Sequence, residues 1–407
     1  MSRSIIMSTL CLLALARSAG AADMPGTPAE ARALERADAL PRTVFYDAAP
    51  NLASTHPGDL LRQQRFEGYA LTAGTRTVRI LYHSLDAAGQ DVVSSAVVLV
   101  PGGAPPTGGW PVIAWAHGTS GVARQCAPSL MKDLYYGDET LNAMISGGFA
   151  VIAVDYHGLG TAGLHEYVTK LAQARDVIYA VPAARAAVAA LGRQWVVDGH
   201  SQGGGAAWGV AELESSLDDP DYLGAVSVAG TFRLEKLIAY LNDTQGGAFY
   251  VAFMAAGIQA QYPEFEPQQV LTARAMRLFR PVTTQGCWFQ GYALFKDMPK
   301  HGTLKPNWQQ NPWVQRYIDG NRQATVRLSK PLLVIGGEGD ETIPIEDLRA
   351  IVRSACATGS SVQLKTYPGL DHDPTMTEST PDQLSWIRDR LAGKPMDESA
   401  CTTGPGT

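Results

Sequence analysis

A serine between two glycines, in Gly199-His-Ser-Gln-Gly203, has the surroundings of a catalytic nucleophile. An apolar segment precedes this motif and a segment rich in small residues follows it. Ser201 should therefore stand on the sharp turn between a strand and a helix. Such a turn crowds the backbone, and glycine at positions 199 and 203 relieves the crowding. The free N–H groups at the start of the helix would face a carbonyl group under attack. The motif predicts nucleophilic attack by Ser201 on carbonyl carbon atoms.

A serine hydroxyl is a weak nucleophile, so a base and an acid that orients the base are needed. In proteins with this motif the acid and then a histidine follow the serine along the chain. Asp340 lies just past the apolar run 331–336, and His372 lies past the expected strand 361–366. Both positions are loops at strand ends, where side chains from separate strands can meet. We expect Ser201, Asp340 and His372 to form a catalytic triad.

Three other carboxylates compete with Asp340 for the role of the acid. Glu338 lies in the same loop, whereas Asp371 and Asp373 flank the histidine. A flanking carboxylate cannot easily turn back onto the neighbouring ring, although it could belong to a metal cluster. His372 itself is expected in a loop before a final helix at about 379–392.

The negative oxygen that forms during such an attack needs two N–H donors. Gln202 directly follows the nucleophile, so its backbone N–H is the first expected donor. The second should come from the loop after the third strand, which reads His117-Gly-Thr-Ser-Gly121. Gly118 lets the backbone approach the substrate, and the N–H of Thr119 is the expected donor. His117 is expected to be a structural hydrogen-bond partner.

The elements that carry these residues alternate between strands and helices. Apolar runs without alternation are typical of strands in a parallel sheet covered on both faces. Helix-length segments separate them, at about 137–147, 169–191 and 202–216. This order predicts a doubly wound α/β core with a mostly parallel sheet. The expected strands are Thr77–Tyr82, Val92–Pro101, Pro111–Ala116, Gly148–Asp155, Gln194–His200, Leu223–Ala229, Pro331–Gly336 and Ser361–Thr366.

The alternation stops between residues 233 and 327, where the periodicity is helical and aromatic residues are frequent. We interpret this segment as a helical lid inserted between two core strands. Its aromatic side chains could form the core of the lid itself, line an acyl pocket or stack on a sugar. The expected domain organisation is a signal peptide at 1–22, a first core part with an N-terminal arm at 23–232, the lid at 233–327 and a second core part with a C-terminal tail at 328–407.

Composition limits the class of protein. Hydrophobic residues make up 45% of the 407 residues and charged residues 18%, so the chain has ample material for a core and is not a disordered polyelectrolyte. The net charge is −6 and no long basic run occurs, which argues against a nucleic-acid partner. Beyond the N-terminus, no apolar run approaches the roughly 18 residues that a membrane span requires.

The N-terminus and the cysteines both indicate export. The first 22 residues have the layout of a secretory signal peptide: Arg3 is followed by an apolar stretch and then by small residues at 18–22. The four cysteines that remain after its removal suit two disulfides, for which three pairings exist. A bridge between Cys356 and Cys401 would tether the C-terminal tail and would leave Cys126 with Cys287.

Gly158-Leu-Gly-Thr-Ala-Gly163 matches the glycine pattern of a dinucleotide site. In such a site the helix opens directly on the glycines and an acidic residue ends the next strand. Here Leu164-His-Glu-Tyr167 intervenes, so we expect no nucleotide site. Because no C-x-x-C spacing occurs, a zinc site of that type is not expected either.

Taken together, the chain resembles the α/β-hydrolase superfamily and, within it, the secreted lipase family of the lipase-A type. The resemblance rests on the serine motif, the His117-Gly-Thr loop, Asp155-Tyr-His-Gly-Leu-Gly160, the Asp340 loop and the late His372, and it covers roughly residues 60–401. It implies an α/β-hydrolase fold with a helical lid and ester hydrolysis by the triad. It also supports the pairs Cys126–Cys287 and Cys356–Cys401. At His157 the family often has an acidic residue, which leaves the role of this histidine open.

The function expected from the sequence is that of a secreted or periplasmic serine esterase or lipase that works through an acyl-enzyme. Its substrate would be a small-molecule or lipid ester, with transient contact between the lid and a lipid interface. The alternatives are an esterase for acylated carbohydrates of the cell wall and a peptidase or amidase with the same triad. We expect no cofactor, no metal and no obligate protein partner.

Overall fold

The structure of the chain is a computed structural model that describes residues 24–47, 51–396 and 401. The expected signal peptide at 1–22 lies outside the described residues. Within them, no helix combines the length and the apolar character that crossing a membrane requires.

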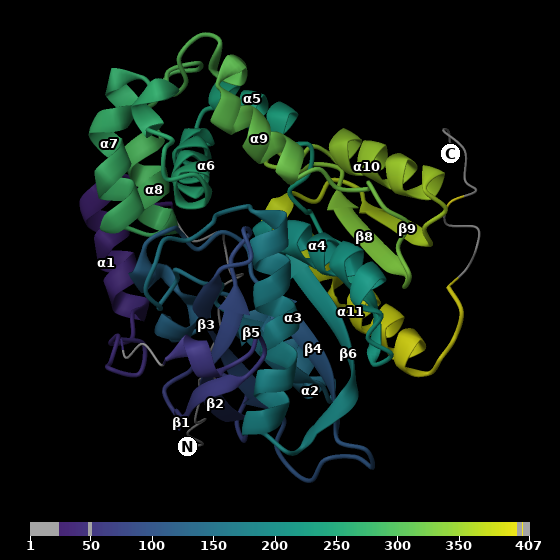
Figure 1. The fold of residues 1–407 in the computed structure, drawn as a ribbon. Coiled ribbons are helices and arrows are strands. Elements are labelled where there is room, and N and C mark those ends of the chain that lie inside the picture. Colours follow the sequence, from purple (N-terminus) through teal and green to yellow (C-terminus); the bar gives the residue numbers. More distant parts are fainter. Residues whose placement is uncertain (1–23, 48–50, 397–400, 402–407) are drawn as a thin grey trace, which may run out of the picture.

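A nine-stranded sheet runs through the molecule in the order β1-β2-β3-β5-β4-β6-β7-β8-β9 (Figure 1). The first three pairings are antiparallel and the remaining five are parallel. The strands are β1 (Leu60–Arg65), β2 (Arg76–Leu85), β3 (Asp91–Val100), β4 (Trp110–Ala116), β5 (Ala150–Val154), β6 (Leu191–His200), β7 (Tyr222–Val228), β8 (Leu332–Gly337) and β9 (Val362–Tyr367). The predicted α/β fold class is confirmed by this mostly parallel sheet and the helices between its strands.

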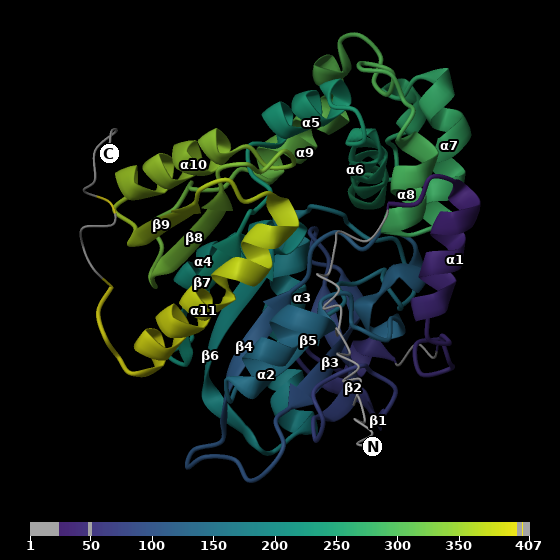
Figure 2. The same ribbon diagram turned by 180° about the vertical axis from the view of Figure 1, so that it is seen from behind.

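Helices cover both faces of the sheet and divide the core into two clusters of buried side chains. One cluster packs α3 (Lys170–Ala187), α4 (Gln202–Leu217) and α10 (Ile345–Ala357) against one face. The other packs α2 (Asn142–Ser146) and α11 (His372–Leu391) against the opposite face, which is turned to the viewer in Figure 2. Strands buried on both faces explain the apolar runs in the sequence.

Three elements have no counterpart in the sequence-based prediction. The edge strand β1 is mostly polar, since its sequence is Leu-Leu-Arg-Gln-Gln-Arg, so it lacks the apolar signature of its neighbours. Helix α1 (Pro28–Asp38) lies in the expected N-terminal arm, with Thr27 and Glu30 forming a capping box at its start. Helix α10 follows the Asp340 loop.

Five helices lie between β7 and β8, in the segment expected to be a lid, which we call the helical insertion (residues 233–327). They are α5 (Leu234–Asp243), α6 (Ala248–Gln261), α7 (Ala273–Thr284), α8 (Trp288–Phe295) and α9 (Pro312–Gly320). Within the described residues, the segment contains no strand and a single isolated β-bridge, between Leu271 and Leu304.

The helical insertion is attached to the core through the start of α8. A disulfide joins Cys287 to Cys126, and the N–H of Trp288 donates to the carbonyl oxygen of Ser120. Glu35 of α1 accepts hydrogen bonds from the N–H groups of Cys287 and Gln290, where a carboxylate interacts favourably with the helix N-terminus. Figure 2 shows α1 beside α8 accordingly. The N-terminal arm thus helps to hold the insertion.

The second disulfide joins Cys356 in α10 to Cys401 in the tail, so both bridges have the pairing that the resemblance supports. The bridge between Cys126 and Cys287 spans 161 residues, and that between Cys356 and Cys401 spans 45. The longer loop restricts the unfolded chain more strongly.

We therefore expect the double variant C126A/C287A to lose about 2–5 kcal/mol of unfolding free energy. The double variant C356A/C401A should lose less, because its loop is shorter. Guanidinium unfolding of both variants, followed by tryptophan fluorescence, measures the difference. A larger loss in C356A/C401A would contradict the prediction.

Candidate active site

Ser201 occupies a strained backbone position between β6 and α4. Its φ and ψ angles are 57° and −118°, a combination that residues with a side chain rarely adopt. Backbone hydrogen bonds hold it there. Its N–H donates to Val228, and its carbonyl oxygen accepts from Gly205 and Thr231. The turn therefore places the serine at the end of the sheet where the parallel strands finish, as the motif predicts.

The two motif glycines make this turn possible. A Cβ atom added to Gly203 would lie 1.8 Å from the carbonyl oxygen of Ala116, and one added to Gly199 would lie 2.2 Å from that of Gly203. Both contacts are with backbone atoms that cannot rotate away. Glycine is thus required here by the close approach of α4 to strands β4 and β6.

Asp340 and His372 meet although 32 residues separate them. The Nδ1 atom of His372 lies 2.8 Å from Oδ2 of Asp340. The other carboxylate oxygen, Oδ1, accepts the N–H groups of Thr342 and Ile343 at 2.8 and 2.7 Å. These bonds fix the carboxylate, so the ring of His372 has a set orientation and its Nε2 atom remains for chemistry. Among the described residues, Nε2 has no hydrogen-bond partner.

His372 is the first residue of α11, so the expectation of a loop at 372 with a helix from about 379 is wrong. Asp371 caps this helix by accepting the N–H of His372 at 2.7 Å. Pro374 suggests a loop in the sequence, but it falls in the first turn, where the backbone N–H has no intrahelical partner and proline is tolerated. A second bond, from the N–H of Glu341 to Asp371, joins this helix start to the Asp340 loop.

The electrostatic surroundings of His372 favour its charged form. Burial acts to lower its pKa, but the hydrogen bond with Asp340 and the charges of Asp340, Asp373 and Asp371 outweigh burial and raise the pKa above the ordinary value. An imidazolium that forms at His372 during a reaction would thus be stabilised by neighbouring carboxylates.

His372 also packs against the residue that precedes the serine. The ring centroids of His200 and His372 lie 4.6 Å apart, and Nε2 of His200 is 3.3 Å from the carbonyl oxygen of His372. The Nδ1 atom of His200 pairs with the hydroxyl of Tyr136 at 2.8 Å. Through His200, α11 is brought next to the nucleophile turn.

The expected oxyanion donors belong to two elements, since Thr119 lies in the loop after β4 and Gln202 is the first residue of α4. Two tyrosines fix Thr119: the hydroxyl of Tyr167 pairs with its Oγ1 at 2.7 Å, and the hydroxyl of Tyr135 donates to its carbonyl oxygen at 2.6 Å. Within the described part of the chain, no residue accepts a hydrogen bond from the N–H of Thr119 or of Gln202. Both donors are therefore uncommitted.

A buried network that the sequence did not reveal supports Gln202. Its side-chain Nε2 lies 3.0 Å from Nε2 of His165, whose Nδ1 is 3.1 Å from the carbonyl oxygen of His157. Burial lowers the pKa of His165 to about 3, so this ring is neutral and can accept the amide proton while its Nδ1–H donates.

His157 anchors the far end of this network. Its Nδ1 atom and its N–H lie 2.8 and 2.9 Å from Oδ2 of Asp176, and its Nε2 lies 3.7 Å from Glu166. Burial acts against the charged ring, but the interactions with Asp176 and Glu166 raise the pKa of His157 to about 9. The role left open for His157 is that of a buried cation between two carboxylates. The Gly158–Gly163 loop follows it directly.

His117 forms hydrogen bonds with backbone oxygens, as expected for a structural residue. Its Nδ1 and Nε2 atoms lie 2.5 and 3.2 Å from the carbonyl oxygens of Gly118 and Asp155, and a neutral ring donates its one N–H to one of these two oxygens. Burial lowers the pKa of His117 to about 4, so the ring is neutral.

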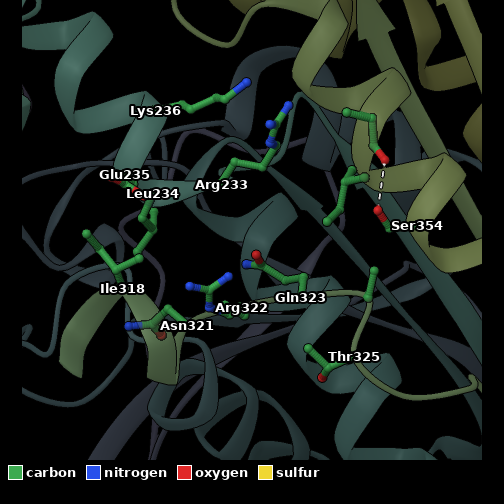
Figure 3. A pocket seen from close by; sticks show the side chains of 13 residues that line it. Arg233, Leu234, Glu235, Lys236, Ile318, Asn321, Arg322, Gln323, Thr325 and Ser354 are labelled. Carbon is green, nitrogen blue, oxygen red and sulfur yellow. Dashed lines mark hydrogen bonds between the residues drawn. The ribbon is translucent and has the colours of Figure 1, made fainter. Parts of the chain in front are cut away.

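The site is nearly closed to solvent, since Ser201 is 7% exposed and Asp340 and His372 are each 8% exposed. A separate cavity of about 440 Å³ lies between α5, the segment after α9, and α10, and none of these three residues lines it (Figure 3). The guanidinium groups of Arg233 and Arg322 at this cavity are paired with Asp347 and Asp319. The cavity is distinct from the nucleophile turn.

Comparison with known proteins places the chain among lipases. Residues 134–399 match the family model of the secretory lipases. Lipase A of Arthroderma benhamiae is 22% identical over 396 residues, which cover 88% of this chain and 81% of that protein. Candida antarctica lipase A in its closed state superposes with a TM-score of 0.77 at 16% identity, covering 91% of this chain and 90% of that one. The rice cell wall degrading esterase LipA from Xanthomonas oryzae has a TM-score of 0.68 at 20% identity, covering 84% and 100%.

The packing of the elbow glycine yields a stability prediction. The variant G203A should fail to fold or should lose at least about 3 kcal/mol, because the new methyl group would overlap the backbone of β4. Gly320, at the end of α9, is the matched control, since a Cβ atom added there would have no neighbouring atom within 4 Å. Thermal unfolding of G203A and G320A measures the contrast, and equal melting temperatures would contradict it.

Proposed function

The chain belongs to the secretory lipase family and is a carboxylic ester hydrolase, for which we propose a catalytic triad of Ser201, His372 and Asp340. The observation that carries this proposal is the hydrogen bond of 2.8 Å between His372 and Asp340, formed beside the strained serine turn. The family is a secretory one, which indicates an extracellular protein. We propose that residues 1–22 direct this export.

In the proposed mechanism, Nε2 of His372 takes the proton from Oγ of Ser201 as the oxygen attacks the ester carbonyl. Nδ1–H of His372 donates to Asp340, which keeps the ring in the required tautomer and stabilises its positive charge. The bonds from Thr342 and Ile343 support this role, since they hold the carboxylate still.

The negative oxygen of the tetrahedral intermediate would lie between the N–H groups of Thr119 and Gln202. Their lack of other acceptors within the described residues supports this assignment. Each such donor lowers the barrier by about 3 kcal/mol. His372 then passes its proton to the departing alcohol, and an acyl group remains on Ser201. Water, activated by the same histidine, releases the acid.

The proposed site offers little open surface to a substrate. Ser201, Asp340 and His372 are each at most 8% exposed in the described arrangement. The helical insertion contacts the loop that carries the expected oxyanion donor, because the N–H of Trp288 donates to Ser120, which follows Thr119. Tyr250 of α6 and Trp288 of α8 are joined by a hydrogen bond of 2.8 Å, and Tyr167 packs on Phe253 with ring centroids 5.9 Å apart. We propose that the insertion acts as a lid.

The first test of the proposal is removal of the nucleophile. The variant S201A should keep its fold and lose at least about 10⁴-fold in kcat toward nitrophenyl esters, because no other hydroxyl stands on the strained turn. Ser216, exposed on α4, provides the control S216A. Substantial residual activity in S201A, or no labelling of the native protein by a fluorophosphonate, would contradict the assignment.

The second test separates the proposed acid from its neighbour. D340N should lower kcat by about 10⁴-fold, since the amide no longer holds the required tautomer of His372. D373N removes an exposed carboxylate that also lies near His372 but forms no hydrogen bond with its ring in the described structure, so its kcat should stay within about threefold of the native value. Steady-state rates in buffer containing EDTA compare the two variants. A larger loss of kcat in D373N than in D340N would contradict the assignment of Asp340 as the acid of the triad.

A further inference from the structure

His200 and Asp373, which have no direct part in the proposed hydrolysis, form a group with the proposed base His372. One ligand atom of each residue lies within 4.8 Å of those of the other two. His200 and His372 are buried, whereas Asp373 is exposed. Two imidazoles and a carboxylate are a common ligand set for zinc, which leaves its fourth position to water.

The geometry points to an inhibitory site for a zinc-type divalent cation, and we propose that His200, His372 and Asp373 bind the ion. Bonds of about 2.1 Å in a tetrahedral site set ligand atoms about 3.4 Å apart, so ligand atoms that lie within 4.8 Å of one another must approach by at most about 1.4 Å. Asp373 can supply this movement, because its exposed side chain is free to rotate.

The two imidazoles can provide nitrogen lone pairs. Nε2 of His372 is without a partner among the described residues, while Nδ1 remains bonded to Asp340. A carboxylate on the far nitrogen is the usual arrangement for a metal-binding histidine. As a ligand through Nε2, His200 would carry its proton on Nδ1, which would donate to the hydroxyl of Tyr136, and only the long contact of 3.3 Å between Nε2 and the carbonyl oxygen of His372 would be lost.

The local charge suits a cation. Asp340, Asp371 and Asp373 all act on His372, and together they counter the positive end of α11. The charge of Asp373 also acts on the hydroxyls of Tyr135, Tyr136 and Tyr250, whose pKa values are raised first by burial and further by this charge. Asp373 is the exposed member of the group, so it connects the two buried imidazoles with solvent.

The consequence for activity rests on the proposed function. A metal ion on Nε2 of His372 uses the lone pair that would accept the proton of Ser201, so the bound ion and the hydrolysis exclude each other. The ion is an inhibitor, and removing it with a chelator restores the free imidazole.

The test measures zinc binding in the variant S201A, full chain with both disulfides, by titration calorimetry. We expect one Zn²⁺ per chain. In the S201A/D373N double variant the affinity should fall by about tenfold or more, whereas S201A/E378Q, which removes an exposed carboxylate farther along α11, should keep it. Co²⁺ as a probe should show the strong visible absorption of a tetrahedral site in S201A and should lose it in S201A/D373N.

Exposed histidine–aspartate pairs elsewhere are the main competitors for the ion. His301 lies 3.1 Å from Asp243, and His56 lies 3.7 Å from Asp59. S201A/H301N and S201A/H56N should therefore bind Zn²⁺ as tightly as S201A. Three results would overturn the proposal. The first is that S201A binds no zinc, the second is that S201A/D373N and S201A/E378Q bind it with equal affinity, and the third is that one of the two histidine variants, S201A/H301N or S201A/H56N, loses binding.

Inhibition of the native enzyme completes the test. Zn²⁺ should block nitrophenyl ester hydrolysis at the concentration at which it binds S201A, EDTA should reverse the block, and D373N should need at least about tenfold more Zn²⁺. If the native protein binds zinc but does not hydrolyse esters, the proposed triad is contradicted and the proposed metal site is not. An active enzyme whose S201A variant binds no zinc would contradict the metal site alone.

Discussion

The backbone of Ser201 is the constraint on which the rest of the site depends. A residue with a side chain is held in a positive-φ conformation because three backbone hydrogen bonds, to Val228, Gly205 and Thr231, fix the turn between β6 and α4. Conformations of this kind cost on the order of 1–3 kcal/mol and persist only where the surrounding structure enforces them. Here the enforcing element is the close approach of α4 to the sheet, which leaves no room for a Cβ atom at Gly203.

Around this turn, two sets of contacts position the remaining groups. In the first set, Asp340, His372 and His200 connect the loop after β8, the start of α11 and the end of β6. In the second set, tyrosines and a neutral histidine hold Thr119 and Gln202. Both sets come from loops at the carboxyl ends of parallel strands, where α/β proteins usually bind their ligands. The disulfide to Cys287 and the carboxylate of Glu35 tie the helical insertion to the same edge.

The sequence predicted the fold and the identity of the triad candidates because those signals are local. Ser201 is marked by its glycines, and Asp340 and His372 are marked by their places after strands. The start of α11 was predicted wrongly, since Pro374 within Asp-His-Asp-Pro looks like a loop until Asp371 is seen capping a helix. The edge strand β1 was not predicted, because its polar residues lack the apolar pattern of buried strands.

The supporting network could not be predicted, because its partners are distant in sequence. Gln202 and His165 are 37 residues apart, and Thr119 and Tyr167 are 48 apart. No local pattern records such pairs. His165 and Glu166 follow glycines whose spacing matches a dinucleotide motif, and the sequence distinguishes His157 only as a departure from the related family. Their arrangement becomes clear only when the loop after β5 is folded over the start of α4.

The central claim is that Ser201 carries the acyl group during ester hydrolysis. Rapid-quench mass spectrometry during turnover of nitrophenyl acetate tests this claim most directly. The account predicts an acetyl group on the peptide that contains Ser201, formed at the rate of the initial release of nitrophenol and absent when the serine is replaced by alanine. Acetylation of another residue, or steady turnover while the peptide with Ser201 stays unmodified at every time, would contradict it.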